Sequence, residues 1–122
     1  MVNNKKILIV DDSDELTHVI ADFLGMFGFR VHTARDGIDA LQCLEREPMD
    51  IVVSDIHMPK MDGYTLMTEI KNRYPETPII LITGFSISEA KKIAFEKGAD
   101  AFVAKPFHLK DLKGVIDKVI SY

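Results

Sequence analysis

The most constraining feature of this chain is a regular alternation of short apolar runs with longer segments of helical periodicity. Five short apolar runs alternate with five segments in which apolar residues recur at helical spacing. Such runs indicate β-strands, and runs without polar alternation indicate strands buried on both faces. Strands that alternate with single helices predict a parallel sheet covered by helices on both faces.

The predicted strands divide into central and edge strands. Residues 7–10, 51–53 and 79–82 are apolar throughout, so we expect them in the middle of the sheet. Residues 30–33 alternate in polarity, which is typical of an edge strand. Residues 101–104 form a shorter run that fits either an edge strand or a loop.

Five helices are predicted from apolar stripes and from the residues that begin or end them. Gly28 ends the first, Asp36-Gly37 and Asp62-Gly63 precede the second and third, and residues 86–89 form a capping box for the fourth, which ends at Gly98. The positions expected to face the core are Leu16, Val19, Ile20, Phe23, Leu24 and Phe27, then Ile38, Leu41 and Leu44, then Leu66, Met67 and Ile70, and finally Leu109, Leu112, Val115, Ile116, Val119 and Ile120.

Length and composition predict one folded unit. The 122 residues are 47% hydrophobic and 28% charged, which is ordinary for a globular protein, and we expect a single domain over residues 5–122 with residues 1–4 as a tail. The net charge of −4 argues against nucleic-acid binding by the domain. No apolar run fits a signal peptide or a membrane span, and the single cysteine, Cys43, excludes an internal disulfide, so we expect a cytoplasmic protein.

Polar side chains follow the strands at the points where the strands end. Asp11 and Asp12 follow the first, Asp55 the third, Thr83 ends the fourth and Lys105 follows the fifth. In open α/β sheets the ligand site lies at the carboxyl ends of the strands. Three carboxylates, a hydroxyl and an amine are therefore expected to converge on one edge.

Such a cluster predicts a divalent cation and a phosphate-like ligand. Two carboxylates about 4 Å apart repel each other by roughly 4 kcal/mol at an effective dielectric constant near 20. Mg²⁺ removes this repulsion and prefers carboxylate and carbonyl oxygens, often together with a phosphate. Lys105 adds a positive charge for an incoming oxyanion and Thr83 adds a donor, so the set favours phosphoryl transfer.

These residues resemble the receiver domain of two-component response regulators, and the resemblance runs from Lys5 to Tyr122. It is carried by the stretches Ile7-Leu8-Ile9-Val10-Asp11-Asp12, Ser54-Asp55-Ile56-His57-Met58-Pro59-Lys60-Met61-Asp62-Gly63, Leu81-Ile82-Thr83-Gly84 and Ala104-Lys105-Pro106-Phe107. The resemblance implies a flavodoxin-like (βα)5 fold, which is a three-layer sandwich around a parallel five-stranded sheet of order 2-1-3-4-5.

The resemblance also implies a role for each residue at the predicted edge. Asp55 matches the phosphorylated aspartate, and the ligands of Mg²⁺ or Mn²⁺ would be Asp12 directly, Asp11 partly through water, Asp55 itself and the backbone carbonyl of His57. Thr83 and Lys105 match the residues that bind phosphoryl oxygens.

Some of the matching positions concern the conformational change after phosphorylation and the lifetime of the phosphorylated state. Thr83 and Phe102 match a switch pair, although Phe102 lacks the hydroxyl that a tyrosine would supply, so packing alone would distinguish its two states. The side chain of His57 is expected either to face solvent or to tune dephosphorylation. The Lys105–Pro106 peptide matches one that is cis in the family.

The implied function is signalling rather than metabolism. The domain would catalyse only its own phosphorylation and dephosphorylation, with a sensor histidine kinase or a histidine phosphotransfer protein as donor. An effector or output domain would bind the face formed by the fourth helix, fifth strand and fifth helix, and a phosphorylation-dependent homodimer is a further expected partner. Neither nucleic acid nor membrane is expected to bind the domain, and both a stand-alone receiver and a part of a larger protein fit the sequence.

Two other classes of protein fit the sequence less well. A phosphatase of the haloacid-dehalogenase type needs Asp-x-Asp-x-Thr/Val after the first strand, whereas residues 12–16 are Asp-Ser-Asp-Glu-Leu, and the chain leaves too little length for a cap domain. An FMN-binding flavodoxin-like module needs a phosphate loop rich in hydroxyls and glycines, whereas residues 11–14 carry three aspartates that would repel phosphate unless a metal intervened.

Overall fold

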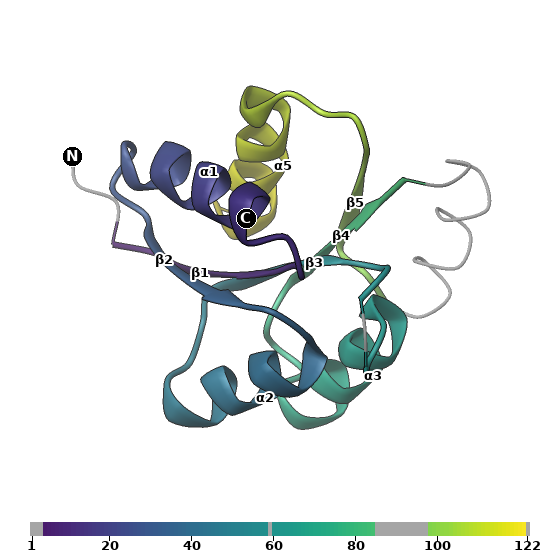
Figure 1. Ribbon diagram of the computed structural model, residues 1–122. Helices are drawn as coiled ribbons and strands as arrows, with labels where there is room; N and C mark the ends of the chain where they lie inside the picture. The colour runs from purple at the N-terminus through teal and green to yellow at the C-terminus, as the bar shows by residue number, and fades with distance from the viewer. Residues whose placement is uncertain (1–3, 59, 85–97, 122) are drawn as a thin grey trace.

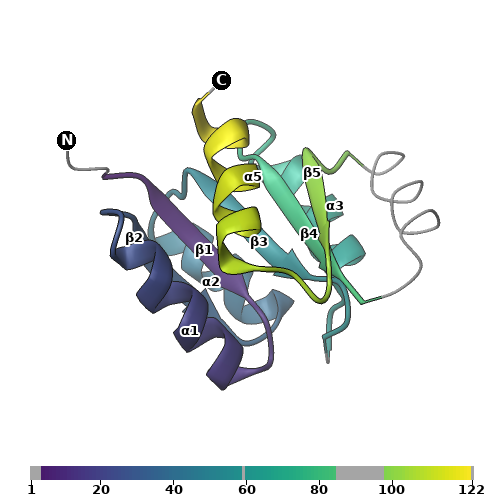
Figure 2. The ribbon, with the colours of Figure 1, turned by 90° about the horizontal axis from the view of Figure 1, so that it is seen from above.

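Five strands form one parallel sheet in the order β2-β1-β3-β4-β5, which confirms the predicted fold class and strand order (Figure 1). The computed structural model describes residues 4–58, 60–84 and 98–121. The strands are β1 (Lys6–Val10), β2 (Arg30–Ala34), β3 (Ile51–Asp55), β4 (Ile79–Thr83) and β5 (Ala101–Ala104). All strand pairs are parallel, so the five carboxyl ends share one edge of the sheet (Figure 2).

Helices cover both faces of the sheet and complete the predicted three layers. α1 (Asp14–Gly25) and α5 (Leu109–Ser121) lie on one face, and α2 (Gly37–Arg46) and α3 (Gly63–Arg73) lie on the other (Figure 1). Side chains alternate along each strand, so Ile7 and Ile9 belong to the core under α1 and α5, and Leu8 and Val10 belong to the core under α2 and α3. The predicted fourth helix and its capping box lie outside the described residues.

The start of each of the first three helices is set by a capping side chain. Ser13, Asp36 and Asp62 each accept a hydrogen bond from the backbone N–H three residues later. The Asp36-Gly37 and Asp62-Gly63 pairs therefore mark helix starts as predicted. Among the described residues, no helix is long and apolar enough to cross a bilayer.

The helix predictions are wrong at the end of α1 and on one face of α2. α1 ends at Gly25, and a turn carries the chain through Gly28, whose φ is 89°, so Phe27 lies beyond the helix. Ile38 was expected to face the core but is 46% exposed, because α2 buries the face that carries Ala40, Leu41 and Leu44.

The position of each strand in the sheet agrees with its polarity. Every residue of β3 and β4 is buried, and β1 is buried after Lys6. β2 lies at one edge and has exposed positions, as its polar alternation predicts. β5 forms the opposite edge, so residues 101–104 form an edge strand rather than a loop.

Candidate phosphoryl-acceptor site

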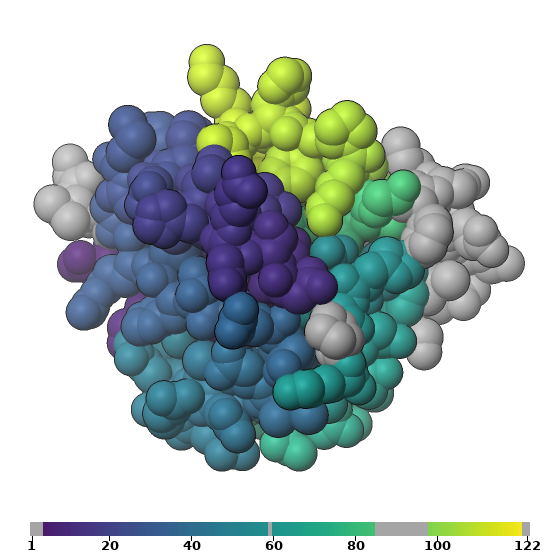
Figure 3. Space-filling model, in the orientation of Figure 1, coloured from purple at the N-terminus to yellow at the C-terminus, as the bar shows by residue number. Residues whose placement is uncertain are grey.

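The carboxyl edge of the sheet brings together the polar residues that follow the strands in sequence. Asp11 and Asp12 follow β1, Asp55 ends β3, Thr83 ends β4 and Lys105 follows β5. The three aspartates each offer one carboxylate oxygen, and these oxygens lie within 4.8 Å of one another. On the molecular surface, segments that are far apart in sequence meet on this side (Figure 3).

Asp55 is a buried residue whose two carboxylate oxygens both have partners. The residue is only 5% exposed. Its Oδ2 lies 3.0 Å from Lys105 Nζ, and its Oδ1 accepts a hydrogen bond of 3.2 Å from the backbone N–H of His57. A buried carboxylate is tolerated when it is paired and hydrogen-bonded, so these two contacts compensate for its burial and orient it.

Lys105 is held at the edge by its backbone as well as by its side chain. Its N–H donates to the carbonyl of Thr83 at 2.7 Å, which extends the pairing of β4 with β5 by one residue beyond Ala104. The Lys105–Pro106 peptide is cis, as the resemblance implies. Lys105 Nζ also lies 3.8 Å from Asp11 Oδ2, so one cation serves two buried carboxylates.

Asp11 is the electrostatically strained member of the cluster. Its Oδ1 accepts a hydrogen bond from the N–H of Ser13 at 2.9 Å, but its buried Oδ2 has no hydrogen-bond partner within the described part of the chain. Burial raises the pKa of Asp11 from 3.8 to about 6, and the charge of Asp55 adds to the increase, whereas the Ser13 N–H and Lys105 oppose it. An unsatisfied buried carboxylate oxygen beside two other carboxylates is chemically suited to bind a cation.

The remaining predicted residues have different environments. Asp12 is exposed although its neighbour Asp11 is buried, and Thr83 is fully buried at the end of β4.

His57 is exposed, while its backbone N–H donates a hydrogen bond to Asp55. Phe102 is partly buried and packs against the core under α2 and α3, two residues before β5 ends. The edge therefore collects Asp11, Asp12, Asp55, Thr83 and Lys105.

Gly63 approaches the end of β3 more closely than the sequence alone predicts. A Cβ atom at this position would lie 2.5 Å from the carbonyl oxygen of Asp55 and 2.8 Å from Cα of Ile56. The Asp62-Gly63 pair indicates only a helix start in sequence, because the approach of α3 to the end of β3 depends on how that helix packs.

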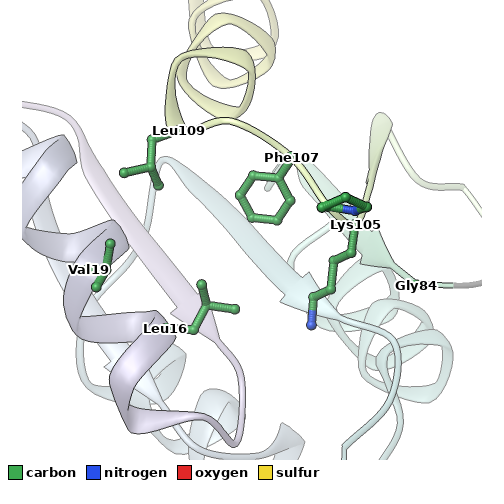
Figure 4. A pocket seen from close by; sticks show the side chains of 7 residues that line it. Leu16, Val19, Gly84, Lys105, Phe107 and Leu109 are labelled. Carbon is green, nitrogen blue, oxygen red and sulfur yellow. The ribbon is translucent and has the colours of Figure 1, made fainter.

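An open groove of about 640 Å³ borders the site (Figure 4). Its lining residues come from α1, from the end of β4 and from the segment between β5 and α5: Leu16, Val19, Gly84, Lys105, Pro106, Phe107 and Leu109. Val19 was expected to face the core, but it is 46% exposed because it faces this groove. Lys105 belongs both to the groove and to the acidic cluster.

Comparison with known proteins agrees with this geometry. The family model of the response regulator receiver domain matches residues 7–117. The chain belongs to the response regulator receiver family. This membership sets aside the two alternative classes, a haloacid-dehalogenase-type phosphatase and an FMN-binding module.

The proteins similar to this receiver domain include sensor kinases, transcriptional regulators and a chemotaxis protein. The chain is 40% identical to the sensor histidine kinase RcsC of Salmonella typhi over 107 residues. This match covers 88% of this chain and 11% of RcsC. It is 37% identical to the probable transcriptional regulator ycf27 of Cyanophora paradoxa, over 98% of this chain and 49% of that protein. The structure of the chemotaxis protein CheY4 of Vibrio cholerae superposes with a TM-score of 0.90 at 30% identity, covering 96% of this chain and 99% of CheY4. This chain thus spans less than half of the length of these kinase and regulator relatives.

Proposed function

We propose that this receiver domain accepts a phosphoryl group on Asp55 from a histidine-phosphorylated protein and thereby changes its affinity for a partner. The observation that carries the proposal is the 3.0 Å contact of Lys105 with Asp55 beside the cluster of Asp11, Asp12 and Asp55. Phosphoryl transfer depends mainly on positioning and on neutralising negative charge. A buried, oriented carboxylate with an adjacent cation supplies both.

The acidic cluster suits Mg²⁺ or Mn²⁺. Among the described residues, nothing donates a hydrogen bond to the buried Oδ2 of Asp11, and the exposed Asp12 leaves one side of the cluster open to water, which Mg²⁺ retains. The proposed ligands are the side chains of Asp11, Asp12 and Asp55 and the backbone carbonyl of His57. A bound ion would neutralise the carboxylates and the phosphoryl oxygens.

The residues of the chain would carry out the transfer as follows. An oxygen of Asp55 forms a bond to phosphorus while the bond from phosphorus to the histidine nitrogen of the donor breaks. The Lys105 ammonium, 3.0 Å from Asp55, neutralises charge on the phosphoryl oxygens, and the Thr83 hydroxyl donates to one of them. Water later hydrolyses the acyl phosphate. The domain would therefore catalyse only its own phosphorylation and dephosphorylation.

The output step of the proposal involves Thr83 and Phe102. Thr83 ends β4 and Phe102 lies on the neighbouring β5, opposite Leu81 in register. Recruitment of the Thr83 hydroxyl by the phosphoryl group would shift the packing of Phe102 and bias the face formed by β5 and α5. An effector, an output domain or a second copy of the chain would then bind that face.

The first prediction tests the acceptor. Incubation with acetyl phosphate and Mg²⁺ should add one phosphoryl group to the protein, measured by intact mass, and Asp55→Asn should remove the adduct because an amide is not a nucleophile of this kind. The control is Asp111→Asn on α5, where the aspartate is exposed and outside the cluster. An adduct of equal yield in Asp55→Asn, or with excess EDTA, would contradict the proposal.

We also propose that the groove beside Lys105 holds the phosphodonor protein during transfer. Its wall carries the apolar side chains of Leu16, Val19 and Phe107, and Figure 4 shows them around the Lys105 side chain, whose amine points toward the end of β3. A donor seated in this groove would bring its phosphohistidine next to Asp55. A small donor such as acetyl phosphate would not need the groove.

The second prediction uses this difference between donors. Val19→Glu should slow transfer from a phosphorylated histidine phosphotransfer protein by about 10-fold or more, because it places a charge on an apolar interface, and it should change the rate with acetyl phosphate less than about 2-fold. Ile38→Glu is the matched control, because Ile38 and Val19 are both 46% exposed and Ile38 lies on α2, across the sheet. Equal rates for the two variants with the protein donor would disprove the assignment of the groove.

A further inference from the structure

The peptide group between Ile56 and His57 is anchored at both of its polar atoms. Its carbonyl oxygen, on Ile56, accepts a hydrogen bond of 2.8 Å from the N–H of Gly63. Its N–H, on His57, donates to Asp55 Oδ1 at 3.2 Å. Because a peptide group is planar and rigid, a rotation at one end reorients the other. This single group therefore connects the first residue of α3 to a carboxylate oxygen of Asp55.

The α3 end of this connection is fixed by the core. Leu66, Met67 and Ile70 are fully buried on the face of α3 that packs on the sheet. The first turn is closed by Asp62, whose Oδ1 accepts a hydrogen bond of 2.8 Å from the N–H of Thr65. The position of the Gly63 N–H is consequently set by the packing and capping of the whole helix.

The absence of a side chain at Gly63 permits this contact. A Cβ there would stand 2.5 Å from the carbonyl oxygen of Asp55 and 2.8 Å from Cα of Ile56, and both of these atoms belong to the backbone and cannot move away by a rotamer change. The requirement for glycine is spatial, because space rather than a left-handed φ excludes a larger residue. Any side chain would separate α3 from the end of β3 and rotate the Ile56–His57 peptide.

We propose that Gly63 is a positioning residue for the phosphoryl acceptor: through the Ile56–His57 peptide, the first turn of α3 holds the Asp55 carboxylate in its reactive orientation. The inference rests on the proposed function, since it takes Asp55 as the acceptor. It adds α3 to the elements that control the reaction, although no side chain of α3 belongs to the acidic cluster.

The main test compares Gly63→Ala with Gly114→Ala. Gly114 lies in α5 with nothing within 4 Å of an added Cβ, so the control adds the same methyl group without a clash. At a temperature where circular dichroism shows all proteins folded, and with saturating Mg²⁺, Gly63→Ala should lower the rate of phosphorylation by acetyl phosphate by about 10- to 100-fold, since small misplacements of reacting groups have effects of this size. Gly114→Ala should react like the wild type.

A second readout does not depend on phosphorylation. The amide proton of His57 is held by Asp55, so its hydrogen exchange, measured by NMR, should accelerate by about 10-fold in Gly63→Ala as this local bond opens. The amide protons of β1 and β4 should keep their wild-type exchange rates. A purely global loss of stability would instead accelerate exchange throughout the sheet.

A milder pair of variants serves if Gly63→Ala does not fold. Asp62 is exposed and caps α3, and Asp62→Ala removes the cap whereas Asp62→Asn keeps a good capping residue, with the same change of charge in both. Asp62→Asn should phosphorylate at least about 3-fold faster than Asp62→Ala, because only the latter loosens the first turn of α3.

The outcomes separate the two proposals. A wild-type protein that takes no phosphoryl group contradicts the proposed function, and the exchange rate of the His57 amide still tests the link to α3. A Gly63→Ala protein that is folded and matches Gly114→Ala in phosphorylation rate and in His57 exchange overturns the positioning role, and so do equal rates for the two Asp62 variants.

Discussion

Lys105→Met is expected to destabilise the metal-free protein and to suppress phosphorylation together. Lys105 Nζ lies 3.0 Å from Asp55 Oδ2 and 3.8 Å from Asp11 Oδ2, and the two aspartates are 5% and 3% exposed. Removal of one partner of a buried ion pair typically costs about 3–5 kcal/mol. The Lys105 side chain is 35% exposed, so water already screens the pair, and we expect a loss of about 2 kcal/mol in the free energy of unfolding.

Mg²⁺ should reduce this loss, because a divalent cation replaces the missing positive charge between the carboxylates. The measurement is urea unfolding at neutral pH with EDTA and with Mg²⁺. Lys110→Met is the control, because Lys110 is exposed on α5, and its free energy of unfolding should change by less than about 0.5 kcal/mol. A Lys105→Met protein as stable as this control in EDTA would show that the buried carboxylates do not depend on Lys105.

The expected effect of Lys105→Met on the phosphorylation rate is larger than its expected effect on the free energy of unfolding. Loss of one preorganised group that stabilises transition-state charge typically lowers a rate by about 100- to 1,000-fold. We therefore expect Lys105→Met to react with acetyl phosphate at least about 100-fold more slowly than Lys110→Met, at saturating Mg²⁺ and in intact-mass time courses. Equal time courses for the two variants would remove Lys105 from the mechanism.

The location of the site was predictable because it follows from topology. Strands that are apolar throughout have to lie in the middle of a sheet, and single helices between them have to return the chain to the same end. Asp12, Asp55 and Lys105 were therefore assigned to one edge from their place after the strands, and the structure brings them together there.

The details that were not predictable depend on distances between elements. Asp11 and Asp12 are neighbours in sequence, yet one is buried and the other exposed, and only the path of the loop after β1 decides which. Val19 and Ile38 lie on apolar stripes, but neighbouring segments leave both 46% exposed. Gly63 resembles an ordinary residue after a helix cap until α3 is packed against β3.

Asp11→Asn is expected to stabilise the metal-free protein at neutral pH while removing its response to Mg²⁺. The pKa of Asp11 is raised from 3.8 to about 6, mainly by burial and further by the charge of Asp55. The folded protein therefore binds a proton on Asp11 that the unfolded chain has already released between these two values. The stability that Asp11 contributes is complete below pH 3.8 and is lost as the pH rises through about 6.

The size of the effect on the free energy of unfolding follows from the pKa shift of Asp11. A difference of roughly two pKa units corresponds to about 3 kcal/mol, so above about pH 7 the ionised Asp11 should cost the metal-free fold up to this amount. Asparagine cannot ionise and still offers an oxygen to the Ser13 N–H, so the variant avoids the cost. The stability difference between variant and wild type should be small near pH 4 and grow to a plateau above about pH 7.

Mg²⁺ should remove most of this difference in stability, because it binds the ionised carboxylate that the variant lacks. At one hundred times its dissociation constant, Mg²⁺ should stabilise the wild type by about 2.7 kcal/mol and the variant by much less. Urea unfolding of both proteins at about pH 5 and about pH 8, each with EDTA and with Mg²⁺, measures these differences in the free energy of unfolding. Asp111→Asn is the control for loss of an exposed charge. If Asp11→Asn instead destabilises the metal-free protein at the higher pH, then Asp11 is not a strained carboxylate, and the electrostatic case for a cation at this edge fails with it.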